Sequence, residues 1–504
     1  MNTVLTIYSA ERQSGKTLLG VNLGVSLLAE TQKSVVLVDV GSDDTTSAAA
    51  TLKLPSPRLM TAAQNAGDVG AHTQSHSSQL DIVTLDAAMF RDTAAAQPFL
   101  TALLTALRGM YGYVILDISS HLSPVTDDII DATDIFLVVV SSLDYDVPIS
   151  IIGHHHYRVI VNMKGQPPKD GKSHAHIKEY LLPEDTLTID ASRQSGVPFV
   201  IQSSSRQISQ TIGRLAREIG KKRFGMAFTG GAALALAQVG IMEVFERNRI
   251  TFDMMTGVSF GALIGGSYAA GIELERIKHH VIEWAQNCRP IAPFDLRRWI
   301  RHEFFLDDGL HHLCDALLGN AYFDELAIPL HVVAIDTRSG AGVVFKEGRV
   351  IDAVKNSMRI PKLFVPFART ERHLIDGSVI SPTPVHPLKQ MGANITVAVA
   401  VTPTPKESQK FFQQNPRGRL TPDEKAAREN YALVAATFDG LMDRLTDEPD
   451  DAELVERVAP DIFILPEIRG ISWRDFHQVS RLIEMGAAAA EAVIGQIETL
   501  RWGE

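Results

Sequence analysis

Short, almost entirely apolar runs alternate with helix-length amphipathic segments through the first part of the chain, and this alternation limits the possible folds more than any other feature. The runs with the length and β-branched content of strands are 4–8, 35–39, 80–85, 113–117, 135–140 and 157–161. Between them, 18–29 and 98–107 have the spacing of amphipathic helices. Strands that are apolar on both faces and are joined by helices form a parallel sheet covered on both sides. The sequence therefore predicts a doubly wound, mostly parallel α/β domain.

A basic amphipathic segment at 205–224 ends this region. Apolar residues recur in it at helical spacing, while arginines and lysines occupy its other side and its end. Such a segment is either the last helix of the first domain, packed by its apolar stripe, or a helix that lies on an anionic membrane. A new strand-like run then begins at 224–229, and the alternation resumes. We therefore expect two domains, residues 1–222 and 223–504.

The overall charge and the cysteine content exclude several classes of protein. The 504 residues include 48 lysines and arginines and 59 aspartates and glutamates, a net charge of −11 that argues against a nucleic-acid partner. Cys288 and Cys314 are too few for a disulfide framework and lack metal-ligand spacing. The first residues lack the basic and apolar regions of a secretory signal. The apolar segment 254–272 contains several glycines and serines, which favour a strand–turn–helix over a membrane span.

The turn after the first predicted strand has most features of a phosphate-binding loop. Gly15, Lys16 and Thr17 precede a predicted helix, although Ala10 occupies the position of the first glycine in the strict pattern. A triphosphate needs backbone N–H groups around its oxygens, a lysine for its charge and a hydroxyl for Mg²⁺. Asp117 ends its own apolar strand, where an acid can hold the Mg²⁺ shell. These residues predict nucleotide binding.

Together these motifs resemble the ParA/MinD family of dimeric P-loop ATPases. The resemblance covers the first domain and includes the run YVILDISSHLSPVTDDIIDATDIFLVVV, the segment VIVNM and the stretch LLPEDTLTIDASRQSGVPFV. It implies a homodimer with ATP and Mg²⁺ as cofactors. The nucleotide-binding residues that it implies are Gly15, Lys16, Thr17, Asp117 and Asn162, with Thr17 and Asp117 on the metal side.

Two positions depart from the pattern of that family. Glu11 stands where the family usually has a lysine that reaches the partner subunit's nucleotide, and Gly41 stands where it usually has a second acid. Arg12 could replace the cation, and Asp43 or Asp44 the acid, but none lies at the matching position. We therefore expect the domain to bind ATP and hydrolyse it slowly; the alternative is a nucleotide-binding fold that serves as a dimerisation scaffold.

In the second domain, the sequence GVSFG at 257–261 has the G-x-S-x-G pattern. Its glycines allow a strained strand-to-helix turn that exposes the Ser259 hydroxyl at the positive end of a helix. A strand-like segment, 252–255, precedes the pattern and a helix-forming segment, 262–270, follows it. This context favours a nucleophile over an incidental serine in a glycine-rich turn.

Two other segments supply partners for Ser259. The run FTGGA joins a strand to a helix, and the backbone N–H groups of Gly230, Gly231 and Ala232 can hold an oxyanion there. The run HLIDG ends in Asp376 on a tight turn, where a carboxylate can accept the serine proton. An ordinary turn aspartate before glycine is the alternative.

In this order, the three elements resemble the patatin-like phospholipase family. The resemblance runs from about residue 224 to about residue 501 and includes FDELAIPLHVVAIDTRSGAGVVF and HLIDGSVISPTPVHPLKQMGANITVAVAV. It implies a patatin-like α/β hydrolase domain with a Ser–Asp dyad: Ser259 as nucleophile and Asp376 as base. The family's oxyanion loop normally continues with Arg and Gly, where this chain has Leu234 and Ala235. The missing arginine removes a positive charge, which either shifts the substrate toward a neutral ester or slows the enzyme.

These observations predict an intracellular serine acyl hydrolase that cleaves carboxylic esters of phospholipids or other acyl lipids without a cofactor. Its nucleotide-switch domain would control dimerisation or localisation. We expect a cytoplasmic homodimer that makes reversible contact with the inner face of a membrane and has no specific nucleic-acid partner. The alternative is a ParA/MinD-type positioning or assembly protein whose patatin fold only binds lipid.

Overall fold

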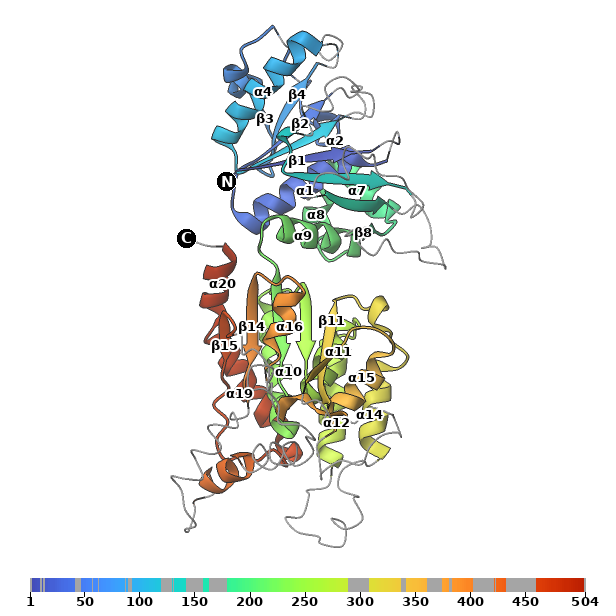
Figure 1. The fold of residues 1–504 in the computed structure, drawn as a ribbon, viewed down its shortest axis with the longest axis vertical. Coiled ribbons are helices and arrows are strands. Elements are labelled where there is room, and N and C mark those ends of the chain that lie inside the picture. Colours follow the sequence, from blue (N-terminus) through green and yellow to red (C-terminus); the bar gives the residue numbers. More distant parts are fainter. Residues whose placement is uncertain are drawn as a thin grey trace. The chain divides into compact units, whose positions relative to one another are not determined.

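In the computed structural model the chain divides into two compact units, Met1–Lys222 and Arg223–Glu504 (Figure 1). Each unit has its own sheet and its own apolar cores. The residues that the structure describes are 2–9, 11, 14–40, 47–56, 58–61, 63–86, 88, 93–118, 129, 131–141, 157–162, 179–288, 308–336, 341–359, 374–379, 383–401, 421, 423–431 and 459–502.

The sheet of the first unit has the order β3-β4-β2-β5-β1-β6-β7-β8, and every pairing except β3 with β4 is parallel. Its strands are β1 (Thr3–Tyr8), β2 (Val35–Val40), β3 (Gln74–Ser75), β4 (Asp81–Leu85), β5 (Tyr113–Ile118), β6 (Ile135–Val140), β7 (Tyr157–Asn162) and β8 (Glu179–Leu182). The prediction of a mostly parallel sheet is confirmed. The two strands at the sheet edges, β3 and β8, are absent from the sequence-based prediction, because both are short.

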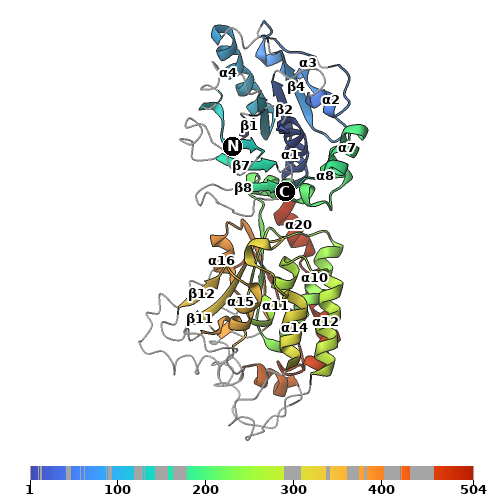
Figure 2. The ribbon, with the colours of Figure 1, turned by 90° about the vertical axis from the view of Figure 1, so that its right-hand side faces the viewer.

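Alternate residues along these strands supply two separate cores. Leu5 and Ile7 of β1 pack with α1 (Lys16–Thr31) and α9 (Gln207–Ile219), whereas Val4 packs on the opposite face with α4 (Thr93–Met110). Figure 2 shows α1 and α4 on opposite sides of β1 and β2. Side chains of successive strand residues point to opposite faces, so helices on both faces require strands that are apolar throughout.

The basic segment at the end of this unit forms α9, and its apolar stripe is buried. Ile212 and Leu215 pack in the same core as α1. Arg217, which is also buried, forms an ion pair with Glu30 of α1 at 2.8 Å. These contacts support the interpretation of a packed last helix, and the apolar stripe is not available to a lipid surface.

The described residues of segment 54–78 form only short elements. They are the 3₁₀ turn η1 (Ala66–Asp68), α3 (Val69–His72) and the strand β3. The other helices described in this unit are α2 (Ala48–Thr51), α7 (Thr186–Ser195) and α8 (Phe199–Gln202).

The sheet of the second unit has the order β12-β11-β10-β9-β14-β15, with β13 also paired to β11. Its strands are β9 (Phe224–Phe228), β10 (Met254–Gly257), β11 (Leu330–Asp336), β12 (Gly342–Phe345), β13 (Leu374–Asp376), β14 (Ile395–Val399) and β15 (Ile462–Ile464). Among these described strands, only β12 and β13 run antiparallel to their neighbour. The strand predicted at 252–255 lies two residues later, because Asp253 accepts a hydrogen bond from the Phe224 N–H before pairing begins.

Helices cover both faces of this sheet, one more heavily than the other (Figure 2). A small cluster on one face contains α16 (Val385–Gln390). The larger core on the other face includes η3 (Ala232–Leu236), α10 (Ala237–Arg247), α11 (Ser259–Ala269), α12 (Leu274–Asn287), α14 (Asp308–Leu318), α15 (Val350–Ser357), η4 (Phe323–Glu325), η6 (Phe476–Gln478), α19 (Val479–Glu491) and α20 (Ile494–Trp502).

The apolar segment 254–272 contains the end of one strand and one buried helix, β10 and α11. Among the helices that the structure describes, none is long and apolar enough to cross a membrane.

Candidate functional sites

The predicted nucleophile lies at a sharp turn between β10 and α11. Ser259 is 2% exposed and has φ +55, a left-handed conformation that costs a non-glycine residue free energy. Two close approaches fix the turn. A Cβ on Gly257 would lie 2.6 Å from the Ala262 Cα, and a Cβ on Gly261 would overlap the Thr229 carbonyl oxygen. The glycines of the G-x-S-x-G pattern are therefore required by space, while the serine itself adopts the strained backbone.

Asp376 lies near this turn because β10 and β13 pair with consecutive parts of the same edge of β11. Along β11, Val332 pairs with Gly257 and Ala334 pairs with Asp376. β12 pairs with the opposite edge of β11, from Val332 to Ile335. β10 and β13 therefore both lie on the other edge. In addition, a Cβ on Gly377 would lie 2.9 Å from the Val258 side chain. The register thus brings together two residues that are more than a hundred positions apart in sequence.

The Asp376 carboxylate is fully buried, and Ser378 holds one of its two oxygens. Oδ1 accepts hydrogen bonds from the Ser378 N–H at 2.8 Å and the Ser378 hydroxyl at 2.7 Å. Oδ2 is buried, and no hydrogen bond of standard geometry reaches it from the described residues. Burial raises the pKa of Asp376 above its ordinary value, and interactions with the Ser259 and Ser378 side chains and the Ser378 N–H oppose that rise.

A second serine, Ser357 at the end of α15, supports the backbone of Ser259. Its hydroxyl accepts a hydrogen bond from the Ser259 N–H at 2.8 Å and donates one to the Val333 carbonyl at 2.6 Å. All three groups are buried or nearly so. The hydroxyl therefore links the turn after β10 to β11, the strand that also pairs with β13 and Asp376.

The loop after β9 lies directly beside Ser259. A Cβ on Gly230 would be 3.1 Å from the Ser259 Cβ, and the following residues have positive φ, +132 at Gly231 and +50 at Ala232. Buried Gln238 fixes the start of the loop, since its amide accepts from the Thr229 N–H and donates to the Thr229 carbonyl.

Within the described chain, no hydrogen bond uses the N–H of Gly230, Gly231 or Ala232 as donor. These N–H groups can therefore donate to an oxyanion. Leu234 and Ala235, the two positions that depart from the family pattern, are buried in the large apolar core.

The predicted phosphate loop also lies between a strand and a helix. Gly15 has φ +92 and precedes α1, which begins at Lys16. The Thr17 hydroxyl donates to Asp117 Oδ2 at 2.5 Å. Burial lowers the pKa of Lys16, and the charge of Asp117 opposes that change. The structure thus brings together the predicted lysine, hydroxyl and acid.

A second buried acid, Asp39, lies beside Asp117. The two residues are paired in register on β2 and β5, and Asp39 Oδ2 accepts a hydrogen bond from the Ala48 N–H at 2.7 Å. Burial and the charge of Asp39 raise the pKa of Asp117 to about 7, although Thr17 and Lys16 counteract them. Among the residues that the structure describes, no group of three or more histidines, cysteines, aspartates and glutamates is placed to hold a metal ion.

The remaining predicted residues of this site are only partly described. The Glu11 carboxylate accepts a hydrogen bond from the Ser141 N–H at 3.3 Å, within the same chain. Asn162 is the last residue of β7, two strands from β1, and its side chain lies outside the described part. Gly41, one of the two departures from the family, and the residues that could compensate for them, Arg12, Asp43 and Asp44, also lie outside the described residues.

Sequence reasoning missed the polar residues that support the predicted sites: Asp39, Gln238, Ser357 and Ser378. Ser378 was detectable, because it follows Asp376 by two residues and a serine there can bond the carboxylate. Ser357 carries no local signal, since its partners Ser259 and Val333 are distant in sequence.

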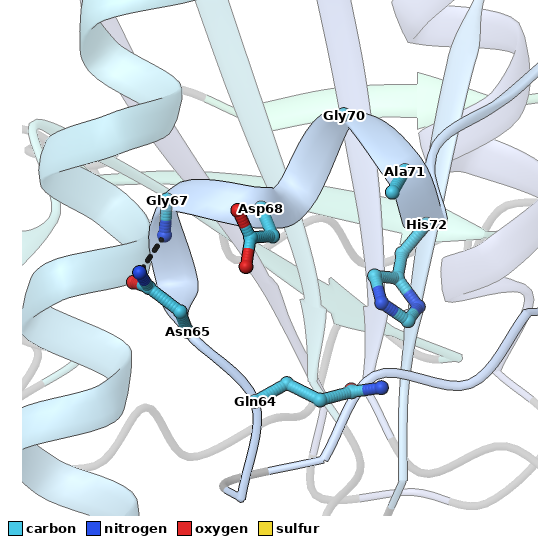
Figure 3. Close-up of a pocket in the computed structure, with 7 residues that line it drawn as sticks. All are labelled: Gln64, Asn65, Gly67, Asp68, Gly70, Ala71 and His72. Atoms are coloured by element: carbon cyan, nitrogen blue, oxygen red, sulfur yellow. Dashed lines mark hydrogen bonds between the residues drawn. The ribbon is translucent and has the colours of Figure 1, made fainter.

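A surface hollow of about 560 Å³ lies elsewhere in the first unit (Figure 3). Its lining residues are Gln64, Asn65, Gly67, Asp68, Gly70, Ala71 and His72. The Asn65 side chain accepts a hydrogen bond from the Gly67 N–H at 3.0 Å and so caps η1. None of the predicted site residues lines this hollow.

Comparison with known proteins identifies the second unit. Residues 226–389 match the family model described as patatin-like phospholipase. An uncharacterised NTE family protein of Mycobacterium tuberculosis is 28% identical over 182 residues, which are 36% of this chain and 49% of that protein. Patatin-like phospholipase domain-containing protein 6 of Mus musculus is 24% identical over 192 residues, 37% of this chain and 14% of that protein. The chain spans about half the length of the mycobacterial relatives that it matches.

The predicted resemblance to the patatin-like phospholipases is confirmed, and the second unit contains such a domain. Solved structures similar to this chain include the septum site-determining protein MinD of Pyrococcus horikoshii in complex with Mg-ADP, at 17% identity and a TM-score of 0.35, covering 44% of this chain and 96% of that one. Another is a ParA family ATPase of Chlorobium tepidum, at 17% identity and a TM-score of 0.34, covering 43% of this chain and 99% of that one.

Proposed function

We propose that the second unit is a serine acyl hydrolase that cleaves carboxylic esters of phospholipids or other acyl lipids. The observation that carries the proposal is the arrangement of Ser259 and Asp376, in which a strained serine interacts with a buried carboxylate beside the loop at Gly230. The patatin-like phospholipase match adds support, because it spans all three elements.

In the proposed reaction, Ser259 Oγ attacks the ester carbonyl carbon while Asp376 accepts the hydroxyl proton. The carbonyl oxygen becomes an oxyanion that the N–H groups of Gly230, Gly231 and Ala232 stabilise. Collapse of this intermediate breaks the ester bond, and the proton passes to the leaving alcohol. Water then attacks the acyl-serine with Asp376 again as base, which releases the fatty acid and restores Ser259.

Substitution of the dyad tests this proposal against matched buried controls. Ser259→Ala should lower hydrolysis of a short-chain chromogenic ester by several orders of magnitude and abolish labelling by a fluorophosphonate probe. Ser267→Ala, in the same helix, removes only a hydroxyl that donates to the Leu263 carbonyl. This variant should keep both ester hydrolysis and labelling by the probe. Asp376→Asn should be as inactive as Ser259→Ala, whereas Asp253→Asn should remain active, since the Asp253 side chain bonds the Phe224 N–H.

Equal labelling of wild type and Ser259→Ala would remove Ser259 as the nucleophile. A folded wild type that binds lipid vesicles without turning over any ester would instead favour the positioning-protein alternative. The substrate itself can be identified by lipidomics of cells that express wild type or Ser259→Ala, because the lipid that the enzyme consumes accumulates only with the inactive variant.

We also propose that the first unit binds ATP with Mg²⁺ and acts as a slow switch for dimerisation or for placement on a lipid surface. Lys16, Thr17 and Asp117 fit a triphosphate and its metal: a half-buried ammonium, a hydroxyl and a carboxylate lie together at the start of α1. Gly15 and the first N–H groups of α1 would surround the phosphates, and Asn162 would contact the base.

Slow hydrolysis follows from Glu11. Its carboxylate bonds the Ser141 N–H of its own chain, and a carboxylate repels the phosphates that a lysine would attract. Loss of a transition-state cation can cost about a thousand-fold or more in phosphoryl transfer. Calorimetry should show Mg-ATP binding that Lys16→Ala abolishes and Lys33→Ala preserves, while phosphate release stays slow. Rapid turnover, or no binding by the wild type, would each contradict one half of the proposal.

Reversible contact with anionic membranes completes the proposal, because the expected substrate is part of a lipid surface. The apolar stripe of α9 is buried, so this contact has to use another surface of the protein. Flotation with anionic vesicles should show binding at low salt that weakens at high salt.

A further inference from the structure

We infer that Ser378 is a positioning residue for Asp376, holding one carboxylate oxygen so that the other faces Ser259. This inference rests on the proposed role of Asp376 as base. Ser378 lies in the 3₁₀ turn η5 (Gly377–Val379), directly after β13. Its backbone N–H and its hydroxyl both donate to Oδ1 of Asp376, at 2.8 Å and 2.7 Å.

Two donors on one oxygen fix the rotation of the carboxylate. A carboxylate with a single hydrogen bond can turn about its Cβ–Cγ bond, because that torsion is broad. The two bonds from Ser378 assign Oδ1 to the turn and leave Oδ2 without a hydrogen bond of standard geometry among the described residues. The Ser259 side chain interacts with this same carboxylate. Oδ1 therefore holds the orientation of the carboxylate, and Oδ2 remains to accept a proton.

The turn that carries Ser378 is itself held in place. A Cβ on Gly377 would lie 2.7 Å from the Val333 carbonyl oxygen, so the backbone of β11 blocks any shift of the turn in that direction. On its other side, the Ser378 Cβ would be 2.9 Å from a Cβ on Gly230. Ser378 thus lies between the base and the oxyanion loop, and a change in its position would affect both.

Few polar groups oppose the rise in the pKa of Asp376 that burial causes. The titratable or charged side chains on the elements packed against β13 are His331, Asp336, Asp352, Lys355 and Arg359. None of them contributes to the pKa of Asp376, which burial raises and only Ser259 and Ser378 lower. Removing the Ser378 hydroxyl should therefore raise this pKa further.

The test compares two serine-to-alanine variants in the same site. Ser378→Ala should lower kcat about ten- to a hundred-fold, because it removes a hydrogen bond to a charged group. Since Asp376 must be ionised to accept a proton, the acid limb of the kcat/KM profile should move to higher pH by about one unit. Ser357→Ala removes a hydroxyl that bonds the Ser259 N–H and should lower kcat without moving the acid limb. Ser378→Thr, which keeps the hydroxyl, should restore the wild-type limb.

A measurement without turnover separates this inference from the hydrolase proposal. In protein labelled with ¹³C at the aspartate carboxyl carbons, the Asp376 signal is identified by its loss in Asp376→Asn. Its titration midpoint should be higher in Ser378→Ala than in wild type and unchanged in Ser357→Ala. Equal midpoints in wild type and Ser378→Ala would overturn the inference, even if the enzyme hydrolyses esters. A raised midpoint in a protein that hydrolyses no ester would support the positioning role and refute the hydrolase.

Discussion

The loop after β1 and the turn after β10 both follow an inner strand of their sheet, but different residue types adopt the positive φ in them. Both connect the end of a central strand to a buried helix, and both require a residue with positive φ. At the loop that residue is Gly15, which adopts the conformation at little cost. At the turn it is Ser259, the proposed nucleophile, and close packing around Gly257 and Gly261 holds it there.

The two sites also differ in charge. The site in the first unit gathers an ammonium and two buried carboxylates, Lys16, Asp39 and Asp117. The site in the second unit gathers one buried carboxylate and three serine hydroxyls. An ammonium beside two carboxylates that repel each other suits a ligand that carries both an anion and a cation. Hydroxyls around one carboxylate suit proton transfer.

The largest expected effect tests this difference in charge through Asp117. Its pKa is raised to about 7 in the folded state from an ordinary value of 3.8, so the folded state holds the proton more tightly than the unfolded state. The stability of the ligand-free first unit should fall as pH rises from about 4 to about 7, by on the order of 4 kcal/mol, and then level off. Asp117→Asn should remove this decline.

Hydrogen-exchange mass spectrometry of β5 across this pH range measures the effect. The exposed Asp131→Asn serves as control and should keep the wild-type pH dependence. The same decline in Asp117→Asn would show that Asp117 is not the group that the folded state holds protonated up to about pH 7.

A second prediction concerns the packing that holds the serine turn. In Gly261→Ala the new Cβ would overlap the Thr229 carbonyl oxygen, and we expect a loss of about 3 kcal/mol in the free energy of unfolding of the second unit. Gly266→Ala, in the same helix, would make only ordinary contacts at 3.5 Å and should change stability by less than about 1 kcal/mol. Urea unfolding followed by tryptophan fluorescence reports this unit alone, because all four tryptophans lie after residue 222. Equal stability of the two variants would argue against the packing described.

The smallest effect tests the strain at Ser259. Both Ser259→Ala and Ser259→Gly remove the hydroxyl, but only glycine relieves the left-handed backbone. Ser259→Gly should therefore be more stable than Ser259→Ala by about 1 kcal/mol in the same unfolding experiment. In the phosphate loop the direction reverses: Gly15→Ala should destabilise the first unit by a similar amount. A Ser259→Gly variant no more stable than Ser259→Ala would show that the turn stores no strain.

Most of the fold was predictable, because its central strands are apolar on both faces. Each strand predicted in the first unit forms, with its ends changed by no more than one or two residues. The prediction missed the edge strands β3 and β8. Both strands are short and partly exposed, so neither contains an apolar run long enough to predict a strand. The shift of β10 has a similar cause, since tertiary pairing and not local composition decides where a strand begins.

The sequence alone determined which residues have special backbone or chemical requirements: Gly15 and Lys16 before one helix, Ser259 between glycines before another, and Asp376 before Gly377. These requirements are local, so a few neighbouring residues express them. Only the tertiary structure decided that Asp376 meets Ser259, because that depends on β13 sharing an edge of β11 with β10. The support from Ser357 was decided in the same way, since strand register and helix packing set distances between residues that are far apart in the chain.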